Sequence, residues 1–206
     1  SVLDFATQPS RVFLYRRPLD QLTMSIAYPN LPVRLVGFLP GITTPGGVTH
    51  QAIDDIAVLR AVPNMTILET GDATEVETVL DVAHAVDGPV YIRMLRGEVA
   101  RLFPKDDPMV LGRARVLGTA GASVDEPAEL VVITAGISTE EALRAVPAVR
   151  AKDVGVTHLH ISTHKPFDDP TVLAALSSAT RGVITMENHL VTGGLGSAVA
   201  EVMADH

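Results

Sequence analysis

The chain contains no cysteine among its 206 residues. A disulfide framework, a thiolate nucleophile and a cysteine-ligated metal are therefore excluded, and the composition is compatible with a reducing compartment. No apolar run approaches the roughly 18 residues that a membrane-spanning helix needs. The first residues, Ser1 to Asp4, lack the basic start and the apolar stretch of a signal peptide. We therefore expect a cytoplasmic protein without a membrane partner.

Positive charge is also scarce. The chain has 16 Lys and Arg residues against 24 Asp and Glu residues, which gives a formal net charge of -8 and a pI near 5.3. Because a nucleic-acid-binding protein normally presents a basic face to phosphate, we expect no nucleic-acid partner. Hydrophobic residues make up 47% of the chain and charged residues 19%, which is sufficient for one large domain or two smaller ones.

Short apolar runs alternate with helical periodicity in the first half of the chain. Three strands are expected, at residues 32–38, 65–68 and 89–94. A helix is expected from about His50, and Asp72 to Glu75 has the spacing of a helix-capping box. Because three strands joined by helices form right-handed crossovers, this half predicts a parallel sheet.

The same alternation restarts in the second half. Three further strands are expected, at residues 130–134, 156–161 and 182–186. Ser138 to Glu141 predicts another capping box, whose helix Pro147 should disturb. Asp169, followed by proline, predicts a helix start, and an apolar face from Leu195 predicts a closing helix.

The chain thus reads as two consecutive three-layer α/β domains with mostly parallel sheets. We expect the first at residues 1–100, a linker at 101–127 and the second at 128–206, truncated at its end. The linker prediction rests on a weaker pattern and on stretches rich in Pro, Gly and Asp.

Three stretches of the first half resemble the pyrimidine-binding domain of transketolase and its relatives. The first is residues 13–31, which read FLYRRPLDQ and then, from Met24, MSIAYPNL. The second is residues 41–65 with Thr-His-Gln at 49–51, and the third is residues 88–98 with the sequence GPVYIR followed by Arg-Gly-Glu. The resemblance implies a domain of the thiamine diphosphate-binding fold.

The second half resembles the C-terminal domain of the same family. Residues 163–168 read THKPFD, and Glu-Asn-His at 187–189 precedes Gly-Gly-Leu-Gly-Ser at 193–197. The resemblance implies a C-terminal subunit that helps transfer a two-carbon ketol unit between sugar phosphates. Thiamine diphosphate would carry the carbanion chemistry, and the protein would supply placement and hydrogen bonds.

Four residues take site roles from the resemblance. Phe13 and Arg16 match positions that contact the pyrimidine ring of thiamine diphosphate, a flat ring that suits an aromatic wall. His50 matches a catalytic, substrate-contacting histidine, whose ordinary pKa near 6.5 suits proton exchange with hydroxyls. Arg96 matches an arginine that binds the substrate phosphate.

Structural interpretations of the same four residues stay open. Phe13 could be a core residue and Arg16 a solvated one. By spacing alone, His50 could be a helix-start residue with only local hydrogen bonds. Arg96 could belong to a surface ion pair, which would contribute about 0–1 kcal/mol.

The remaining histidines are not assigned to the site. His158, His160 and His164 lie on or after one strand, but without a well-placed carboxylate they are a weak metal signal, and we expect no metal site. Glu187 to His189 is interpreted as structural or interfacial.

Two family features are missing. The Gly-Asp-Gly motif that binds Mg and the diphosphate does not occur, and Gly71-Asp72-Ala73 is interpreted as a helix cap instead. The family also activates its cofactor with a glutamate, yet no Glu occurs here before Glu69. We hypothesise that a segment carrying this glutamate is left out between Arg11 and Val12.

The missing diphosphate motif implies an obligate partner, an N-terminal transketolase subunit, in an α2β2 assembly. In the loop from Phe38 to Thr49, Leu39 and Gly46 stand where many transketolases carry a histidine and an acidic residue. A branched, deoxy or otherwise unusual sugar phosphate is therefore expected as substrate. Two alternatives stay open: another thiamine enzyme, of the deoxyxylulose-phosphate synthase or 2-oxoacid dehydrogenase β type, and a non-catalytic assembly subunit.

Overall fold

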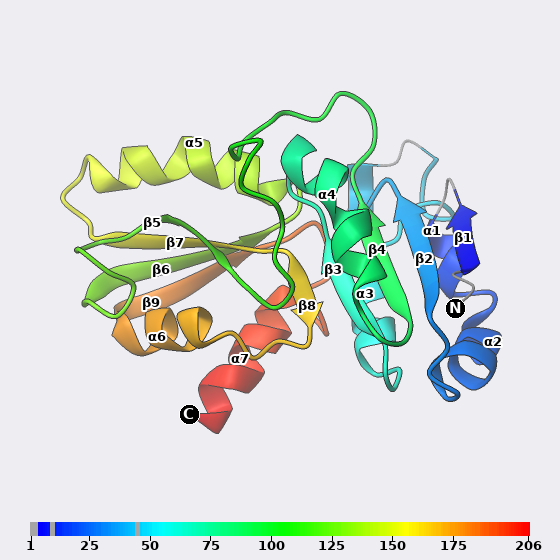
Figure 1. Cartoon of the computed structure of the whole chain (residues 1–206). Coiled ribbons are helices and arrows are strands. Elements are labelled where there is room, and N and C mark those ends of the chain that lie inside the picture. The colour runs from blue at the N-terminus through cyan, green and yellow to red at the C-terminus, as the bar shows by residue number, and fades with distance from the viewer. Residues whose placement is uncertain (1–3, 9–10, 44–45) are drawn as a thin grey trace.

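The computed structural model describes residues 4–8, 11–43 and 46–206. They form two sheets side by side, each flanked by helices on both faces (Figure 1). The predicted fold class, two α/β units with mostly parallel sheets, is confirmed.

The first sheet has five strands in the order β1-β2-β4-β3-β8. These are β1 (Asp4–Gln8), β2 (Val33–Phe38), β4 (Val90–Met94), β3 (Thr66–Glu69) and β8 (Thr163–Lys165). The first four are parallel to one another, as the crossover pattern predicts, and β8 pairs antiparallel with β3. The second half of the chain therefore contributes the last strand of the first sheet.

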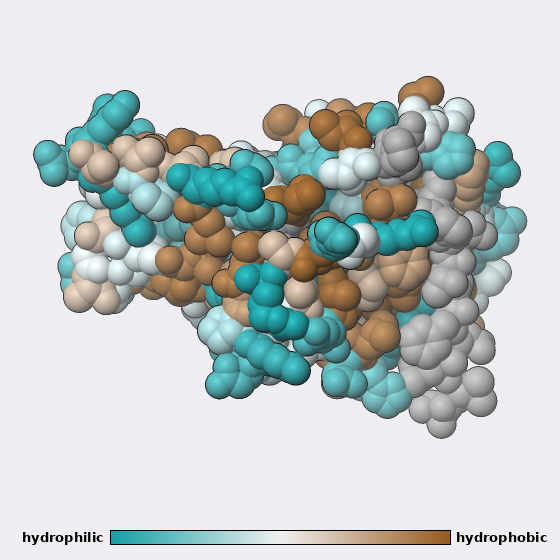
Figure 2. Space-filling model, turned by 90° about the horizontal axis from the view of Figure 1, so that it is seen from above, coloured by the Kyte–Doolittle hydropathy of each residue, from teal (hydrophilic) through white to brown (hydrophobic). Residues whose placement is uncertain are grey.

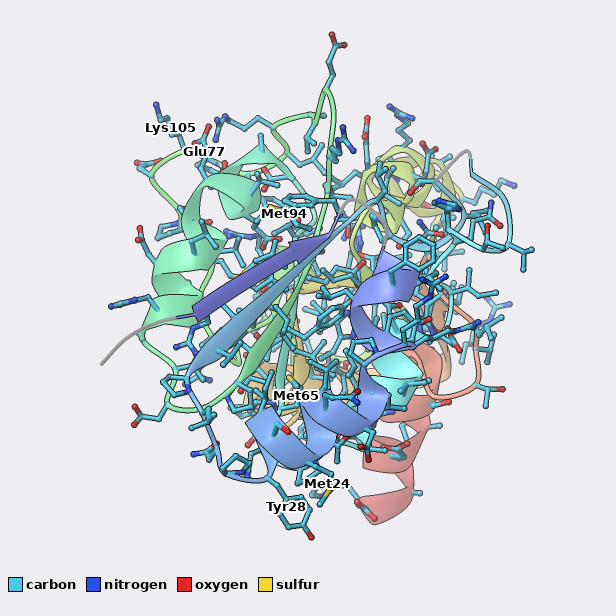
Figure 3. The ribbon with its side chains drawn as sticks, turned by 90° about the vertical axis from the view of Figure 1, so that its right-hand side faces the viewer. Met24, Tyr28, Met65, Glu77, Met94 and Lys105 are labelled. Carbon is cyan, nitrogen blue, oxygen red and sulfur yellow. The ribbon has the colours of Figure 1, made fainter. Side chains whose placement is uncertain are left out.

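Helices cover both faces of this sheet. One face carries α1 (Arg11–Tyr15), α2 (Leu19–Gln21), the π-helix η1 (Leu22–Ala27) and α3 (Asp55–Arg60), and the other carries α4 (Ala73–His84). Figure 3 shows α4 on one side of the strands and α1, α2 and α3 on the other. Apolar residues on both faces of the strands are buried, among them Leu35 and Tyr91 on the α1 face and Val36 and Ile92 on the α4 face. Burial on both faces explains the near-continuous apolar runs of the strands.

The second sheet has four strands in the order β5-β7-β6-β9. They are β5 (Arg115–Gly118), β7 (Val156–Ile161), β6 (Ala128–Ala135) and β9 (Ala179–Met186). Figure 1 shows α5 (Ser138–Arg150) over one face, with α6 (Pro170–Ser178) and α7 (Leu195–Asp205) over the other. Strand β5, which pairs antiparallel with β7, lies in the stretch predicted to be only a linker.

Two predicted helix starts are confirmed, one predicted capping box is wrong, and one predicted interruption does not occur. Asp72 caps α4 by accepting from the Glu75 N–H at 2.8 Å, and Asp169 caps α6 by accepting from the Thr171 N–H. The predicted capping box at Ser138 is wrong, because Ser138 already lies inside α5 and its hydroxyl donates to Ala135 O and Met186 O. Pro147 lies inside α5 and does not end it, because the helix continues to Arg150.

The surface mixes polar and apolar residues. Figure 2 shows hydrophilic and hydrophobic residues interspersed over the upper face. No helix in the described part of the chain is long and apolar enough to cross a membrane. The hypothesised gap between Arg11 and Val12 falls inside α1 and stays a prediction.

Candidate functional site

The carboxyl ends of three parallel strands bring the predicted site residues to one edge of the first sheet. Strands β1, β2 and β4 are neighbours, and Phe38 at the end of β2 is paired with Met94 at the end of β4. Figure 3 places Met94 at the upper end of the sheet and Met24 and Tyr28 at the opposite end. The segments after these strands carry Phe13, His50 and Arg96. Ligands of parallel α/β sheets usually bind at this edge.

Phe13 and His50 are in direct contact, although 37 positions of sequence separate them. Their ring centroids are 5.3 Å apart with an angle of 79° between the ring planes, an edge-to-face arrangement. Both side chains are half-buried. The guanidinium of Arg17 lies over the Phe13 ring, 4.3 Å from its centroid. Phe13 is thus neither a fully buried core residue nor an isolated surface ring.

His50 lies in a turn, five residues before α3 begins at Asp55, so the predicted helix start near His50 is wrong. Its N–H donates to Gly47 O at 2.9 Å, and its Nδ1 is 2.9 Å from the Thr49 hydroxyl. The imidazole packs on Gly46, where a Cβ atom would be only 2.7 Å from the ring Cγ. The glycine at position 46 therefore makes room for this placement of His50.

Arg16 belongs to a polar cluster with Tyr15 and Asp54. Its Nη2 donates to Asp54 Oδ2 at 2.7 Å and its Nε to the Tyr15 hydroxyl at 3.1 Å. The Tyr15 hydroxyl donates to the other oxygen of Asp54. Burial raises the pKa of Tyr15, and the hydrogen bond to Asp54 adds to that effect. Among the described residues, the cation over Phe13 is Arg17, which sequence reasoning did not select.

Arg96 is exposed and follows the end of β4. No hydrogen bond or ion pair links it to another residue in the described part of the chain. Among residues 4–8, 11–43 and 46–206, Arg96 therefore has no surface ion pair, and its role stays a prediction. A guanidinium in this position, at the carboxyl edge of the sheet, can bind an anion.

Charged side chains are buried where the two sheets meet. The guanidinium of Arg93 contacts Asp55 Oδ2 at 3.0 Å and also Glu69, and all three side chains are almost completely buried. Burial lowers the pKa of Arg93, but the carboxylates of Asp55 and Glu69 outweigh this effect and raise it. The Tyr91 hydroxyl donates to Asp55 at 2.7 Å. This cluster is structural, because Arg93 is enclosed by its partners.

Two histidines of the second half, His160 and His164, also contact carboxylates at this boundary. His160 Nε2 is 3.0 Å from Glu75 Oε2, and His164 Nε2 is 2.7 Å from Glu69 Oε2. His158 lies beside Thr134, and burial lowers its pKa to about 4, with His160 and Arg150 contributing. No group of three or more His, Cys, Asp or Glu residues that could hold a metal ion is found in the described ranges.

Asn188, which sequence reasoning treated as structural or interfacial, reaches the loop that carries His50. Its Nδ2 donates to Pro40 O at 2.8 Å, and its Oδ1 accepts from the Ile42 N–H at 3.0 Å. The motif at 187–189 could be recognised in the sequence. Its contact with the loop could not, because Asn188 and Ile42 are 146 positions apart and no local pattern links them.

Two family models match the chain. Residues 3–101 match the transketolase pyrimidine-binding domain, and residues 120–206 match the transketolase C-terminal domain. A 6-deoxy-6-sulfo-D-fructose transketolase subunit from Clostridium sp. (strain MSTE9) is 37% identical over 97% of this chain and 60% of its own length. A subunit of an apulose-4-phosphate transketolase from Actinobacillus succinogenes is 31% identical over 94% of this chain and 60% of its own length. The chain therefore spans about 60% of these relatives.

Solved structures give the same result. A structure described as a split gene transketolase, inactive beta4 tetramer, is 33% identical, has a TM-score of 0.86 and covers 98% of this chain and 62% of its own. A transketolase from Campylobacter jejuni subsp. jejuni has a TM-score of 0.72 over 89% of this chain and 28% of its own, and at 18% identity it supports the fold alone. The resemblance found in the sequence is confirmed: this chain belongs to the transketolase family and corresponds to its C-terminal section.

Proposed function

We propose that this chain is the pyrimidine-binding subunit of a transketolase that moves a two-carbon ketol unit from a ketose phosphate to an aldose. The observation that carries the proposal is the contact between Phe13 and His50, at 5.3 Å, at the carboxyl edge of the first sheet. It joins a ring that can pack on the cofactor to an imidazole that can exchange protons with a substrate.

The residues present fit one end of thiamine diphosphate. Phe13 is half-buried and offers an aromatic wall to a pyrimidine ring. The guanidinium of Arg17 lies over the same ring, and because this side chain is exposed it has solvent to move into when a pyrimidine occupies that face. When bound, the cofactor supplies stabilisation of a carbanion on the transferred unit.

The other end of the cofactor needs a second subunit. The Gly-Asp-Gly motif for Mg and diphosphate is absent from the sequence. Two similar proteins are named as transketolase subunits, and one similar structure is described as a split gene transketolase. These names support an N-terminal partner subunit, which we propose carries the diphosphate and Mg site. The symmetric α2β2 assembly is our proposal for the stoichiometry.

The chain's own residues would act on the substrate. The imidazole of His50 would hydrogen-bond a substrate hydroxyl and exchange a proton with it. The guanidinium of Arg96 would hold the substrate phosphate by charge-assisted hydrogen bonds. Gly46, where an acidic side chain would collide with His50, leaves fewer polar contacts for substrate hydroxyls. Together with relatives named for sulfofructose and apulose phosphate, this supports an unusual sugar as substrate.

The test is an assay of the chain with its partner subunit, thiamine diphosphate and Mg, on a panel of ketose phosphates and aldoses. The proposal expects exchange between sugars without gas. Release of carbon dioxide from pyruvate would instead indicate a synthase or 2-oxoacid dehydrogenase type. Cofactor binding without turnover of any substrate would indicate a non-catalytic subunit, for which the absence of Glu before Glu69 is the supporting observation.

A further inference from the structure

The side chain of Asn188 makes two hydrogen bonds to the backbone of the loop between β2 and α3, residues 39–54. It donates to Pro40 O at 2.8 Å and accepts from the Ile42 N–H at 3.0 Å. A primary amide is suited to this task because it presents a donor and an acceptor side by side. Asn188 belongs to the segment between β9 and α7, so the contact crosses from the second sheet unit to the first.

The far end of the same loop is attached to the same segment. The Leu190 N–H donates to Ile53 O at 2.8 Å. The two ends of the loop are joined to each other, since the Gly41 N–H donates to Ala52 O at 3.0 Å. The buried guanidinium of Arg93 donates to both Ala52 O and Asn188 O, which ties the β9–α7 segment to the sheet. His50 lies between these two attachment points.

At the start of the loop the backbone conformation is one that requires stabilising contacts from its surroundings. Leu39 has a φ of +62°, which a leucine rarely adopts, and such a conformation persists only where its surroundings hold it. Gly41 has a φ of +58°, and a Cβ atom there would lie 2.0 Å from Asn188 Oδ1. The backbone at Gly41 is therefore in close contact with the Asn188 amide.

We propose that Asn188 is a positioning residue for the candidate site, through which the C-terminal domain fixes the loop that presents His50. Asn188 acts through the loop backbone and touches no substrate. The proposal rests on the proposed function for its catalytic consequence, whereas the fixing of the loop can be measured without any activity.

The first test is hydrogen exchange of peptides covering residues 39–43 in the full chain assembled with its partner. Asn188→Ala removes both side-chain hydrogen bonds. Lys165→Met is the matched control, because Lys165 also crosses between the units with two hydrogen bonds to backbone carbonyls, Arg60 O and Val62 O, but not to this loop. We expect exchange about tenfold faster in Asn188→Ala and unchanged in Lys165→Met.

The second test separates positioning from general stability. Asn188→Ala should lower kcat by about tenfold while the Kd for thiamine diphosphate and the melting temperature change no more than in Lys165→Met. Asn188→Asp, which keeps the acceptor for Ile42 but loses the donor to Pro40, gives a second variant if the alanine variant folds poorly, and it should lie between wild type and alanine.

The outcomes are distinct. Unchanged exchange of residues 39–43 in both Asn188 variants would overturn the proposal, and so would faster exchange with kcat equal to that of Lys165→Met. If wild type shows no ketol transfer, the proposed function fails, yet the exchange experiment still decides whether Asn188 holds the loop.

Discussion

The imidazole of His160 meets the carboxylate of Glu75 across the boundary between the two sheets, with Nε2 3.0 Å from Oε2 and both side chains almost fully buried. Glu75 also accepts from the Gly71 N–H, and the other ring nitrogen of His160 lies 2.7 Å from the Thr139 hydroxyl. Both ring nitrogens of His160 and Oε2 of Glu75 thus have hydrogen-bond partners, as buried polar groups require. The pair joins the capping turn of α4 to β7.

Replacing His160 with leucine should destabilise the chain, because Glu75 Oε2 and the Thr139 hydroxyl each lose a buried hydrogen-bond partner. A loss of about 1–3 kcal/mol in the free energy of unfolding is expected. Urea denaturation measures it, and Arg144→Ala, which breaks exposed pairs with Glu140 and Glu141, is the control with an expected loss of at most about 1 kcal/mol. Equal losses in both variants would contradict a structural role for the buried pair.

His158 should make stability depend on pH. Burial, with His160 and Arg150 nearby, lowers its pKa to about 4 in the folded chain, against roughly 6.5 when unfolded. The unfolded state therefore binds more protons between these values, so His158 costs stability as pH falls from about 6.5 to about 4. The difference in free energy of unfolding between wild type and His158→Gln should shift by about 2–3 kcal/mol over this window, measured by urea denaturation at several pH values. If the difference in free energy of unfolding between the two proteins did not change with pH, the lowered pKa of His158 would be ruled out as a cause.

Phe13→Ala should weaken thiamine diphosphate binding more than Arg16→Ala does. Stacking of a heteroaromatic base on an aromatic side chain contributes about 1–3 kcal/mol, whereas Arg16 is held by Asp54 at 2.7 Å. Calorimetric titration of the assembled enzyme gives the two Kd values. If Arg16→Ala had the larger effect, the pyrimidine would lie on the side of the Tyr15 and Asp54 cluster instead.

Arg96→Ala should raise KM for a phosphorylated substrate and leave KM for the unphosphorylated sugar unchanged. A hydrogen bond to a charged group contributes about 1.5–3 kcal/mol, which corresponds to roughly a 10- to 150-fold change. Steady-state kinetics on both sugars measures the difference, with Arg181→Ala, an exposed arginine paired with Glu129, as control. An equal rise of KM for both sugars would show that Arg96 does not contact the phosphate.

Helix caps and strands could be predicted from the sequence, because each depends on residues close together in the chain. The carboxylates of Asp72 and Asp169 cap the predicted helices, and the apolar runs of β2, β4 and β7 form strands at the expected positions. Contacts between distant segments did not follow. Strand β8 has only three residues, which is too few to show a periodic pattern. It also pairs with β3, about 100 positions away in the sequence, so no local signal predicts the pairing.

The sequence proposed the members of the candidate site but not their arrangement, and the roles of these residues stay predictions. Phe13, His50 and Arg96 came from motif matching, and the structure brings Phe13 and His50 into contact. Arg16 and Arg17 are adjacent in sequence, and only packing decides that Arg17 lies over the Phe13 ring. The role of Asn188 was invisible because its two hydrogen bonds join segments that only the folded chain brings together.

The most direct measurement follows the transferred carbons. The chain, its partner subunit, thiamine diphosphate and Mg would be given a ketose phosphate labelled in its first two carbons together with an unlabelled aldose. The account predicts that both labelled carbons appear together in a product two carbons longer than the aldose, with no labelled carbon dioxide. Loss of label as gas, or cofactor binding without any labelled product across the panel of sugars, would contradict it.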